Sequence, residues 1–198
     1  PTEIEISESG TCNRKCSFCP RSDPKFEDKK EFMSNSLHEK MCIELKELNY
    51  AGTVRYSGFV EPLLDKNIYH LINMVNNYIP NTNIEMVTNG DPLNNVRLKK
   101  LFNNGLNKIL ISAYDGKEEA QKLKDLCLEL NLNENQFIVR HRYLSEDQDF
   151  GIALSNRSGL MENAEFKIKS LKEPLNKPCY IPSYTFFLDY QGDVLMCP

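Results

Sequence analysis

Three of the seven cysteines lie close together near the start of the chain, at Cys12, Cys16 and Cys19. Three and then two residues separate them, which is too close for pairwise disulfide bonds, so metal or redox chemistry is the better interpretation. Three thiolates on one compact loop can each bind one iron of a four-iron cluster and leave the fourth iron open. A structural zinc site is the alternative, but it needs a fourth ligand, and the nearest candidates, His38 and Cys42, fall on a predicted helix.

Short β-rich runs alternate with longer stretches of helical periodicity, which is typical of stacked βα units with a parallel sheet. The predicted strands are residues 3–7, 53–57, 84–88, 108–112 and 136–143, and the predicted helices include residues 37–48, 68–75, 98–102 and 123–130. The run 149–160 offers a short further strand. Residues 185–189 and 193–197 flank a turn at Gly192 and predict a hairpin.

The composition is that of an ordinary globular protein: 198 residues, 40% hydrophobic and 26% charged, with a net charge of −4. Basic and acidic residues are interspersed, so we expect neither nucleic acid nor a membrane as a partner. No apolar run approaches the roughly 20 residues of a membrane span, and the start of the chain lacks a signal-peptide pattern. We therefore expect a cytoplasmic protein. Cys42 and Cys127 fall on apolar helical stripes and are expected in the core.

The loop from Thr11 to Pro20, directly after the first predicted strand, resembles the cluster-binding signature of radical S-adenosylmethionine (SAM) enzymes. The resemblance implies an α/β fold, a partial (β/α) TIM-like barrel of five to six parallel strands. It also implies a reduced [4Fe-4S] cluster that cleaves S-adenosyl-L-methionine to a 5′-deoxyadenosyl radical. In that family an aromatic residue before the third cysteine meets the adenine, and Phe18 occupies this place.

Residues after the second and third predicted strands resemble cofactor-binding segments of the same family. Gly58 and Glu61, followed by Pro62, resemble a Gly-Gly-Glu-Pro segment that meets the amino group of the cofactor, although Val60 replaces one glycine. A glycine turn before a helix that starts with proline would explain Gly58 but not Glu61. Asn89 lies in an Asn-Gly segment that lines the cofactor pocket in the family, and a tight turn is the alternative.

The fourth and fifth predicted strands carry three more candidates. Ser112 resembles a serine that meets the ribose, although a serine at a strand end is common. Arg140 and Arg142 alternate with His141, so both arginines face one side of the sheet. The carboxylate of the cofactor is a natural partner for a guanidinium group. An ion pair with Glu5 or another buried acid agrees equally well with the sequence.

Cys179, Gly192 and Cys197 resemble the opening of the cysteine-rich C-terminal extension called SPASM, or of its shorter relative, the twitch domain. The resemblance implies an auxiliary [4Fe-4S] cluster whose remaining ligands lie beyond Pro198. Two ordinary buried cysteines beside a hairpin are the alternative. We therefore expect a radical SAM barrel in residues 1–160, a connection in residues 161–178, and the start of the extension in residues 179–198.

The leading functional hypothesis is a radical SAM oxidoreductase that abstracts a hydrogen atom from its substrate. A slight preference for dehydrogenation of a small polar molecule comes from residues 156–159, which resemble a segment of relatives that act on such molecules. A peptide-modifying radical SAM enzyme is one alternative, and a non-catalytic iron-sulfur electron carrier, which would bind all its irons through protein ligands, is another. The enzyme would need a small-molecule or peptide substrate and an electron donor such as flavodoxin or ferredoxin.

Overall fold

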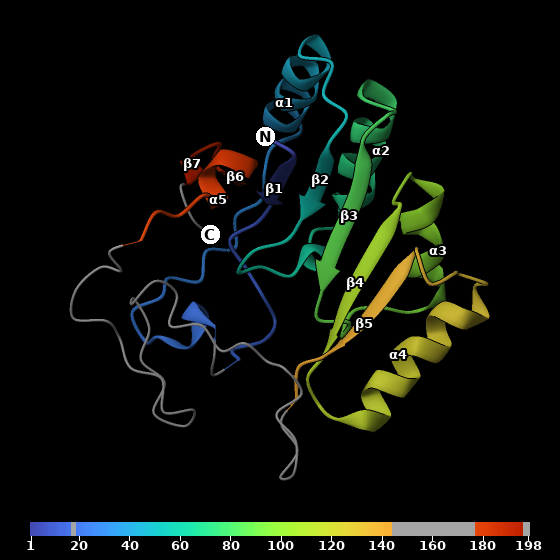
Figure 1. Cartoon of the computed structure of the whole chain (residues 1–198). Helices are drawn as coiled ribbons and strands as arrows, with labels where there is room; N and C mark the ends of the chain where they lie inside the picture. Colours follow the sequence, from blue (N-terminus) through green and yellow to red (C-terminus); the bar gives the residue numbers. More distant parts are fainter. Residues whose placement is uncertain (17–18, 144–176, 196–198) are drawn as a thin grey trace.

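The structure is a computed structural model that describes residues 1–16, 19–143 and 177–195. Its centre is a seven-stranded sheet with the order β5-β4-β3-β2-β1-β6-β7 (Figure 1). Neighbouring strands are parallel except for β6 and β7. The strands are β1 (Glu3–Ser7), β2 (Thr53–Tyr56), β3 (Asn83–Thr88), β4 (Lys108–Ala113), β5 (Phe137–His141), β6 (Thr185–Asp189) and β7 (Val194–Leu195).

Four helices connect the first five strands and cover one face of the sheet (Figure 1). They are α1 (Asn35–Glu47), α2 (Ile68–Tyr78), α3 (Asn95–Asn103) and α4 (Lys117–Glu129). The short helix α5 (Ile181–Tyr184) and two 3-10 turns, η1 (Pro20–Ser22) and η2 (Pro62–Leu64), complete the described elements. Cys42 of α1 and Cys127 of α4 are fully buried, as the apolar stripes predict. Within the described part of the chain, no helix combines the length and apolar character needed to cross a membrane.

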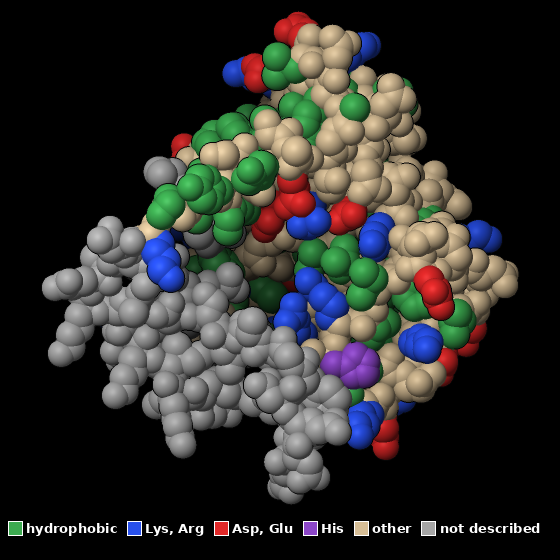
Figure 2. Space-filling view, in the orientation of Figure 1, with side chains coloured by type: hydrophobic (Ala, Val, Ile, Leu, Met, Phe, Trp, Pro, Cys, Tyr) green, Lys and Arg blue, Asp and Glu red, His purple; other side chains and the backbone are tan. Residues whose placement is uncertain are grey.

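Alternation along the strands separates an apolar face from a polar one. In β1, Ile4 and Ile6 are buried in the core beneath the helices, whereas Glu3 lies on the opposite, open face. There Nη1 of Arg55, on β2, donates to Oε1 of Glu3 at 2.7 Å, and its Nη2 donates to Oε2 of Glu85, on β3, at 2.9 Å. Figure 2 shows acidic and basic side chains beside a hollow on this side of the molecule. The open face is therefore suited to polar chemistry.

The sixth parallel strand comes from the end of the chain. β6 pairs with β1 over its whole length, from Glu3 opposite Thr185 to Ser7 opposite Asp189, and the chain then turns back into antiparallel β7. The expected parallel strands and the expected hairpin are therefore confirmed, and the hairpin continues the same sheet. The short strand expected in residues 149–160 lies outside the described residues.

Candidate functional site

Three cysteines line one cavity at the carboxyl ends of the parallel strands. Cys12, Cys16 and Cys19 follow β1 and line a cavity of about 120 Å³. Segments that follow β2, β3 and β4 complete its wall and include Gly58, Glu61, Asn89 and Tyr114. Parallel barrels place their ligand sites at this end of the strands, so the cavity lies where the fold predicts chemistry.

Hydrogen bonds fix the described residues of the first cysteine loop. The amide of Cys19 donates to the carbonyl of Cys16 at 2.9 Å. The backbone amide of Arg14 and the side-chain amide of Asn89 donate to the sulfur of Cys12, at 3.4 and 3.8 Å. Burial raises the pKa of Cys12 and raises that of Cys16 to about 11, so these thiols keep their protons until a metal displaces them.

The lining of the cavity bears on whether the three thiols hold a zinc ion or a cluster. A structural zinc ion is closed by four protein ligands. Among the described residues, Asp91, Asp115 and Glu119 form the only group of three potential ligands whose atoms all lie within 4.8 Å of one another, and the three cysteines do not form such a group. Within the same residues, no fourth cysteine and no histidine lines the cavity. The site therefore fits a multi-iron group with one open position better than a closed zinc site.

Glu61 lies in the cavity wall with only 1% of its surface exposed, and its carboxylate joins two strand ends. Its Oε1 accepts hydrogen bonds from the hydroxyl of Thr88 at 2.7 Å and from the amide of Leu63 at 3.0 Å. Its Oε2 accepts from the amide of Asn89 at 2.7 Å. Burial raises the pKa of Glu61 to about 6 in spite of these donors. Because a carboxylate can accept about four hydrogen bonds, one position remains for a ligand.

Gly58 and Asn89 shape the wall on either side of Glu61. Gly58 has a φ of +116°, and a Cβ atom there would lie 2.1 Å from Oγ of Ser7, so only glycine fits this close approach of two strand ends. Asn89 lines the cavity and also forms a turn, because its Oδ1 accepts from the amide of Asp91 at 3.0 Å. Asn89 therefore both lines the cavity and forms a turn, and its contact with a cofactor stays a prediction.

Ser112 lies on β4, Arg140 lies on β5 and Arg142 lies just after β5, and none of the three lines this cavity. Nη2 of Arg140 donates to Oγ of Ser112 at 3.0 Å, while Nε of Arg140 is buried without a partner among the described residues. Burial lowers the pKa of Arg140, and the nearby charge of Arg142 lowers it further. His141 lines a separate groove beside α4, which agrees with the predicted alternation.

The ion pair expected as the alternative for these arginines is not formed in the described part of the chain. Glu5 instead accepts a hydrogen bond from Oγ of Ser57 at 2.7 Å. Among the described residues, neither Arg140 nor Arg142 forms a salt bridge with a carboxylate. The open face thus carries two positive charges that no described acid neutralises, which is a suitable arrangement for an anionic ligand.

Arg21 is a cavity residue that motif comparison does not identify. It is 4% exposed, lies in η1 just after Cys19, and pairs with Asp28. Its Nη1 donates to the carbonyls of Gly10 and Phe59, at 3.2 and 3.0 Å. This positive charge acts on Cys12, where it lowers the pKa of the thiol and so favours the ionised form that binds a metal. A basic residue two positions after the third cysteine is the only sequence signal for this role.

The remaining predicted site residues are Phe18, Cys179 and Cys197. Phe18 and Cys197 lie outside the described residues. Cys179 is exposed and does not line the cavity. The structure therefore brings together Cys12, Cys16, Cys19, Gly58, Glu61 and Asn89, and among the described residues it leaves Cys179 outside this group.

A family model and a curated relative both identify radical SAM proteins as similar to this chain. Residues 6–133 match the Radical SAM superfamily. The chain is 30% identical over 194 residues to the S-adenosyl-L-methionine-dependent 2-deoxy-scyllo-inosamine dehydrogenase of Niallia circulans, and the match covers 98% of this chain and 72% of that protein.

Solved structures extend the comparison. The crystal structure of BtrN in complex with AdoMet and 2-DOIA has a TM-score of 0.79 and 27% identity, and the match covers 99% of this chain and 72% of that chain. A structure of anSMEcpe with bound AdoMet has a TM-score of 0.57 and 16% identity, over 70% of this chain and 42% of that chain. The second likeness concerns the fold alone.

Proposed function

Because the chain belongs to the radical SAM superfamily and is a radical SAM enzyme, we propose that Cys12, Cys16 and Cys19 hold its SAM-binding [4Fe-4S] cluster. Their common position around one cavity is the observation that carries this proposal. When bound and reduced, the cluster supplies the electron that splits S-adenosyl-L-methionine into methionine and a 5′-deoxyadenosyl radical. Flavodoxin or ferredoxin is the class of donor that we propose for that electron.

Residues of the cavity wall, and residues at and after the ends of β4 and β5 outside it, suit different charged groups of the cofactor. The buried carboxylate of Glu61 suits the amino group of the cofactor, because one of its acceptor positions is still open. Arg140 and Arg142 suit its carboxylate, because no described acid neutralises them. Gly58 and Asn89 line the approach to the cavity, Ser112 holds Arg140 in place, and we keep Phe18 as the contact for the adenine.

For the substrate, we propose a small polar molecule with a hydroxyl group on the carbon that loses hydrogen. The support is the 30% identity to a 2-deoxy-scyllo-inosamine dehydrogenase, whereas the likeness to anSMEcpe extends only to the fold. Oxidation of such an alcohol to a ketone removes two electrons and two protons. One hydrogen atom goes to the 5′-deoxyadenosyl radical, and the remaining electron and proton need an acceptor.

An auxiliary [4Fe-4S] cluster held in part by Cys179 and Cys197 would be a one-electron acceptor of the required kind. Two thiolates do not complete such a site, so this part of the proposal needs further ligands. It depends on the resemblance of the Cys179, Gly192 and Cys197 spacing to a SPASM or twitch extension, because Cys179 is exposed and Cys197 lies outside the described residues.

The test is an anaerobic assay of reconstituted protein with dithionite, S-adenosyl-L-methionine and a panel of aminocyclitols, polyols and peptides. We expect 5′-deoxyadenosine to form in step with a ketone from one of the cyclitols or polyols. Deuterium on the carbon that bears the oxidised hydroxyl should appear in 5′-deoxyadenosine. If only a peptide transfers deuterium, the enzyme class stands and the proposed substrate class is wrong.

A further inference from the structure

Arg14 lies between the first two cysteines of the first cysteine loop, and its side chain leaves the loop to reach a distant segment. Its Nε and Nη2 atoms donate to the two carboxylate oxygens of Asp91, at 2.7 and 2.5 Å. Asp91 follows β3, 77 residues further along the chain. Nδ2 of the neighbouring Asn13 donates to the same carboxylate at 2.6 Å. Two consecutive loop residues are therefore tied to the end of β3.

The same guanidinium group also reaches the end of β4. Its Nη1 and Nη2 donate to the two oxygens of Asp115, at 2.9 and 2.7 Å, and Nη2 lies 3.3 Å from Oε1 of Glu119. The other oxygen of Glu119 accepts from the amides of Tyr114 and Asp115, at 2.6 and 2.7 Å, which fixes this acid at the start of α4. The plane of Arg14 also lies over the ring of Tyr114, 5.2 Å from its centre, and Tyr114 lines the cavity.

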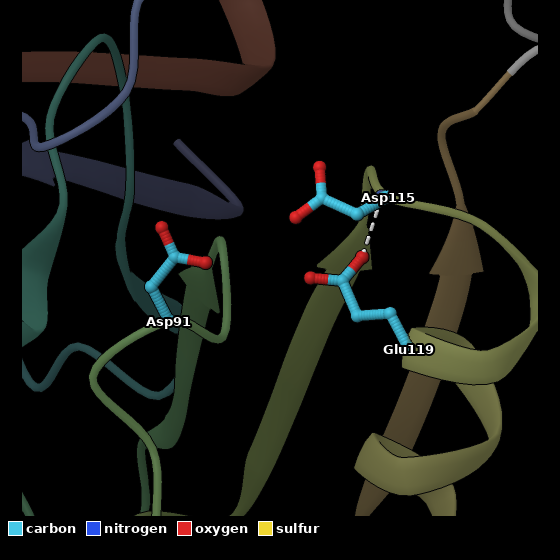
Figure 3. A group of neighbouring side chains, drawn as sticks. All are labelled: Asp91, Asp115 and Glu119. Atoms are coloured by element: carbon cyan, nitrogen blue, oxygen red, sulfur yellow. Dashed lines mark hydrogen bonds between the residues drawn. The ribbon is translucent and has the colours of Figure 1, made fainter.

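Figure 3 shows the three carboxylates of Asp91, Asp115 and Glu119 directed toward one another from the segments after β3 and β4 and from α4. Three acids so close would repel each other, and a cation between them removes that repulsion. The guanidinium group of Arg14 is that cation, so we assign no metal ion to the group.

We propose that Arg14 is a positioning residue for the cluster: its clamp on Asp91, Asp115 and Glu119 holds the first cysteine loop at the ends of β3 and β4, with its thiols turned to the cavity. This inference rests on the proposed function, because it takes Cys12, Cys16 and Cys19 as the cluster ligands. A planar guanidinium group serves two bidentate carboxylates at once, which a lysine ammonium group cannot do. The clamp thus fixes the direction in which the loop leaves Cys12 and returns to Cys16.

Because the clamp is partly exposed, it should also respond to salt. The side chain of Arg14 is 18% exposed and that of Asp115 is 65% exposed. Ionic strength screens such pairs, so high salt should loosen the loop in the native protein and have no such effect where the clamp is already broken. Lys15 supplies a matched control, because it is the next basic residue of the same loop, is exposed, and makes none of these ion pairs.

The experiment compares the reconstituted native protein with Arg14→Gln, Arg14→Lys, Asp115→Asn and Lys15→Gln. Iron loss to a chelator is followed at low and high salt, and electron paramagnetic resonance (EPR) spectra of the reduced proteins are recorded with and without S-adenosyl-L-methionine. We expect Arg14→Gln to lose iron about tenfold faster than Lys15→Gln, with altered g-values and little dependence on salt. Arg14→Lys should retain iron better than Arg14→Gln but less well than the native protein. Asp115→Asn should lose iron faster than the native protein, by a smaller factor than Arg14→Gln.

Equal iron retention, g-values and salt dependence in Arg14→Gln and Lys15→Gln would overturn the clamp. Should circular dichroism show that Arg14→Gln is unfolded, Asp115→Asn decides, since it removes one exposed acid only, and native behaviour of that variant would also overturn the clamp. The same experiment includes a triple variant in which Cys12, Cys16 and Cys19 are replaced by Ala. This variant distinguishes failure of the proposed Arg14 clamp from failure of the proposed cluster site. Iron retained by the triple variant would contradict the cluster assignment itself.

Discussion

Two regions of the molecule carry cysteines that resemble cluster ligands, and the structure treats them differently. In the first cysteine loop, all three thiols line one cavity that also includes Glu61 and Asn89. In the C-terminal segment, Cys179 is exposed before α5, and the hairpin that follows continues the sheet beside β1. Among the described residues, segments distant in sequence converge on the thiols of the first cysteine loop, so this site depends on the meeting of several strand ends as well as on the spacing of the cysteines.

The largest effect that separates the two regions should be on iron content. Replacing Cys12, Cys16 and Cys19 together by Ala removes every thiol from the cavity, so we expect the roughly four irons of the first cluster to be lost. Iron analysis after anaerobic reconstitution measures this, and formation of 5′-deoxyadenosine should stop as well. Full iron content in the triple variant would mean that the loop is not the cluster site.

A smaller effect should come from the acid in the wall of the first region. Glu61→Gln loses a charge-assisted hydrogen bond to the amino group of the cofactor, so we expect affinity for S-adenosyl-L-methionine to fall roughly one to two orders of magnitude. Equilibrium binding to the cluster-loaded protein measures it. Thr88→Val is the matched control, because it removes one internal donor to Glu61 and keeps the carboxylate. Equal losses in the two variants would give Glu61 a purely internal role.

The two regions should also differ in how pH affects stability. Glu8, directly after β1, is fully buried, and burial raises its pKa to about 8. The folded state therefore keeps this proton while the unfolded chain releases it, so the free energy of unfolding falls between about pH 4.5 and pH 8, by up to about 1.4 kcal/mol per unit. Glu8→Gln should remove this loss, and its advantage in melting temperature over the native protein should grow from pH 5 to pH 8.

The exposed acid Asp193, in the turn of the C-terminal hairpin, supplies the control for that measurement. Asp193→Asn should leave the dependence of melting temperature on pH as it is in the native protein. If both variants changed the pH dependence of the melting temperature to a similar extent, or if Glu8→Gln did not change it, the dependence could not be assigned to Glu8.

The smallest effect is expected at the exposed cysteine. Cys179→Ala should leave the iron held by the first cysteine loop unchanged, because Cys179 does not line the cavity. Iron analysis of the 198-residue protein, with Cys16→Ala as the positive control, tests this. Loss of the first cluster in Cys179→Ala, seen as the same loss of iron and of 5′-deoxyadenosine formation as in Cys16→Ala, would show that the two regions share a site.

Local signals in the sequence predict much of the fold and part of the site. The alternation of Glu3, Ile4, Glu5 and Ile6 predicts β1 and its two faces, and the cysteine spacing predicts the loop that follows. The pairing of β6 with β1 is not predictable in this way, because the paired residues, such as Glu3 and Thr185, lie 182 positions apart and nothing local specifies the partner.

The partners of the charged residues in the site are also not predictable from the local sequence. Arg14 and Arg21 stand among or beside the cysteines, but their partners follow other strands or lie on other loops, as Asp91 and Phe59 do. Glu61 is identified by its likeness to a family segment, yet its bonds to Thr88 and Asn89 depend on the contact between the ends of β2 and β3. Roles of this kind arise only when the sheet brings the strand ends together.

The central claim is that the first cysteine loop holds a cluster with one iron open to the cofactor. The most direct measurement is the EPR spectrum of the reduced, reconstituted protein before and after addition of S-adenosyl-L-methionine. We expect a [4Fe-4S]⁺ signal whose g-values shift when the cofactor is added, in the native protein and in Cys179→Ala alike. A cluster signal that S-adenosyl-L-methionine leaves unchanged would contradict the claim and would indicate an electron carrier with all its irons bound by protein.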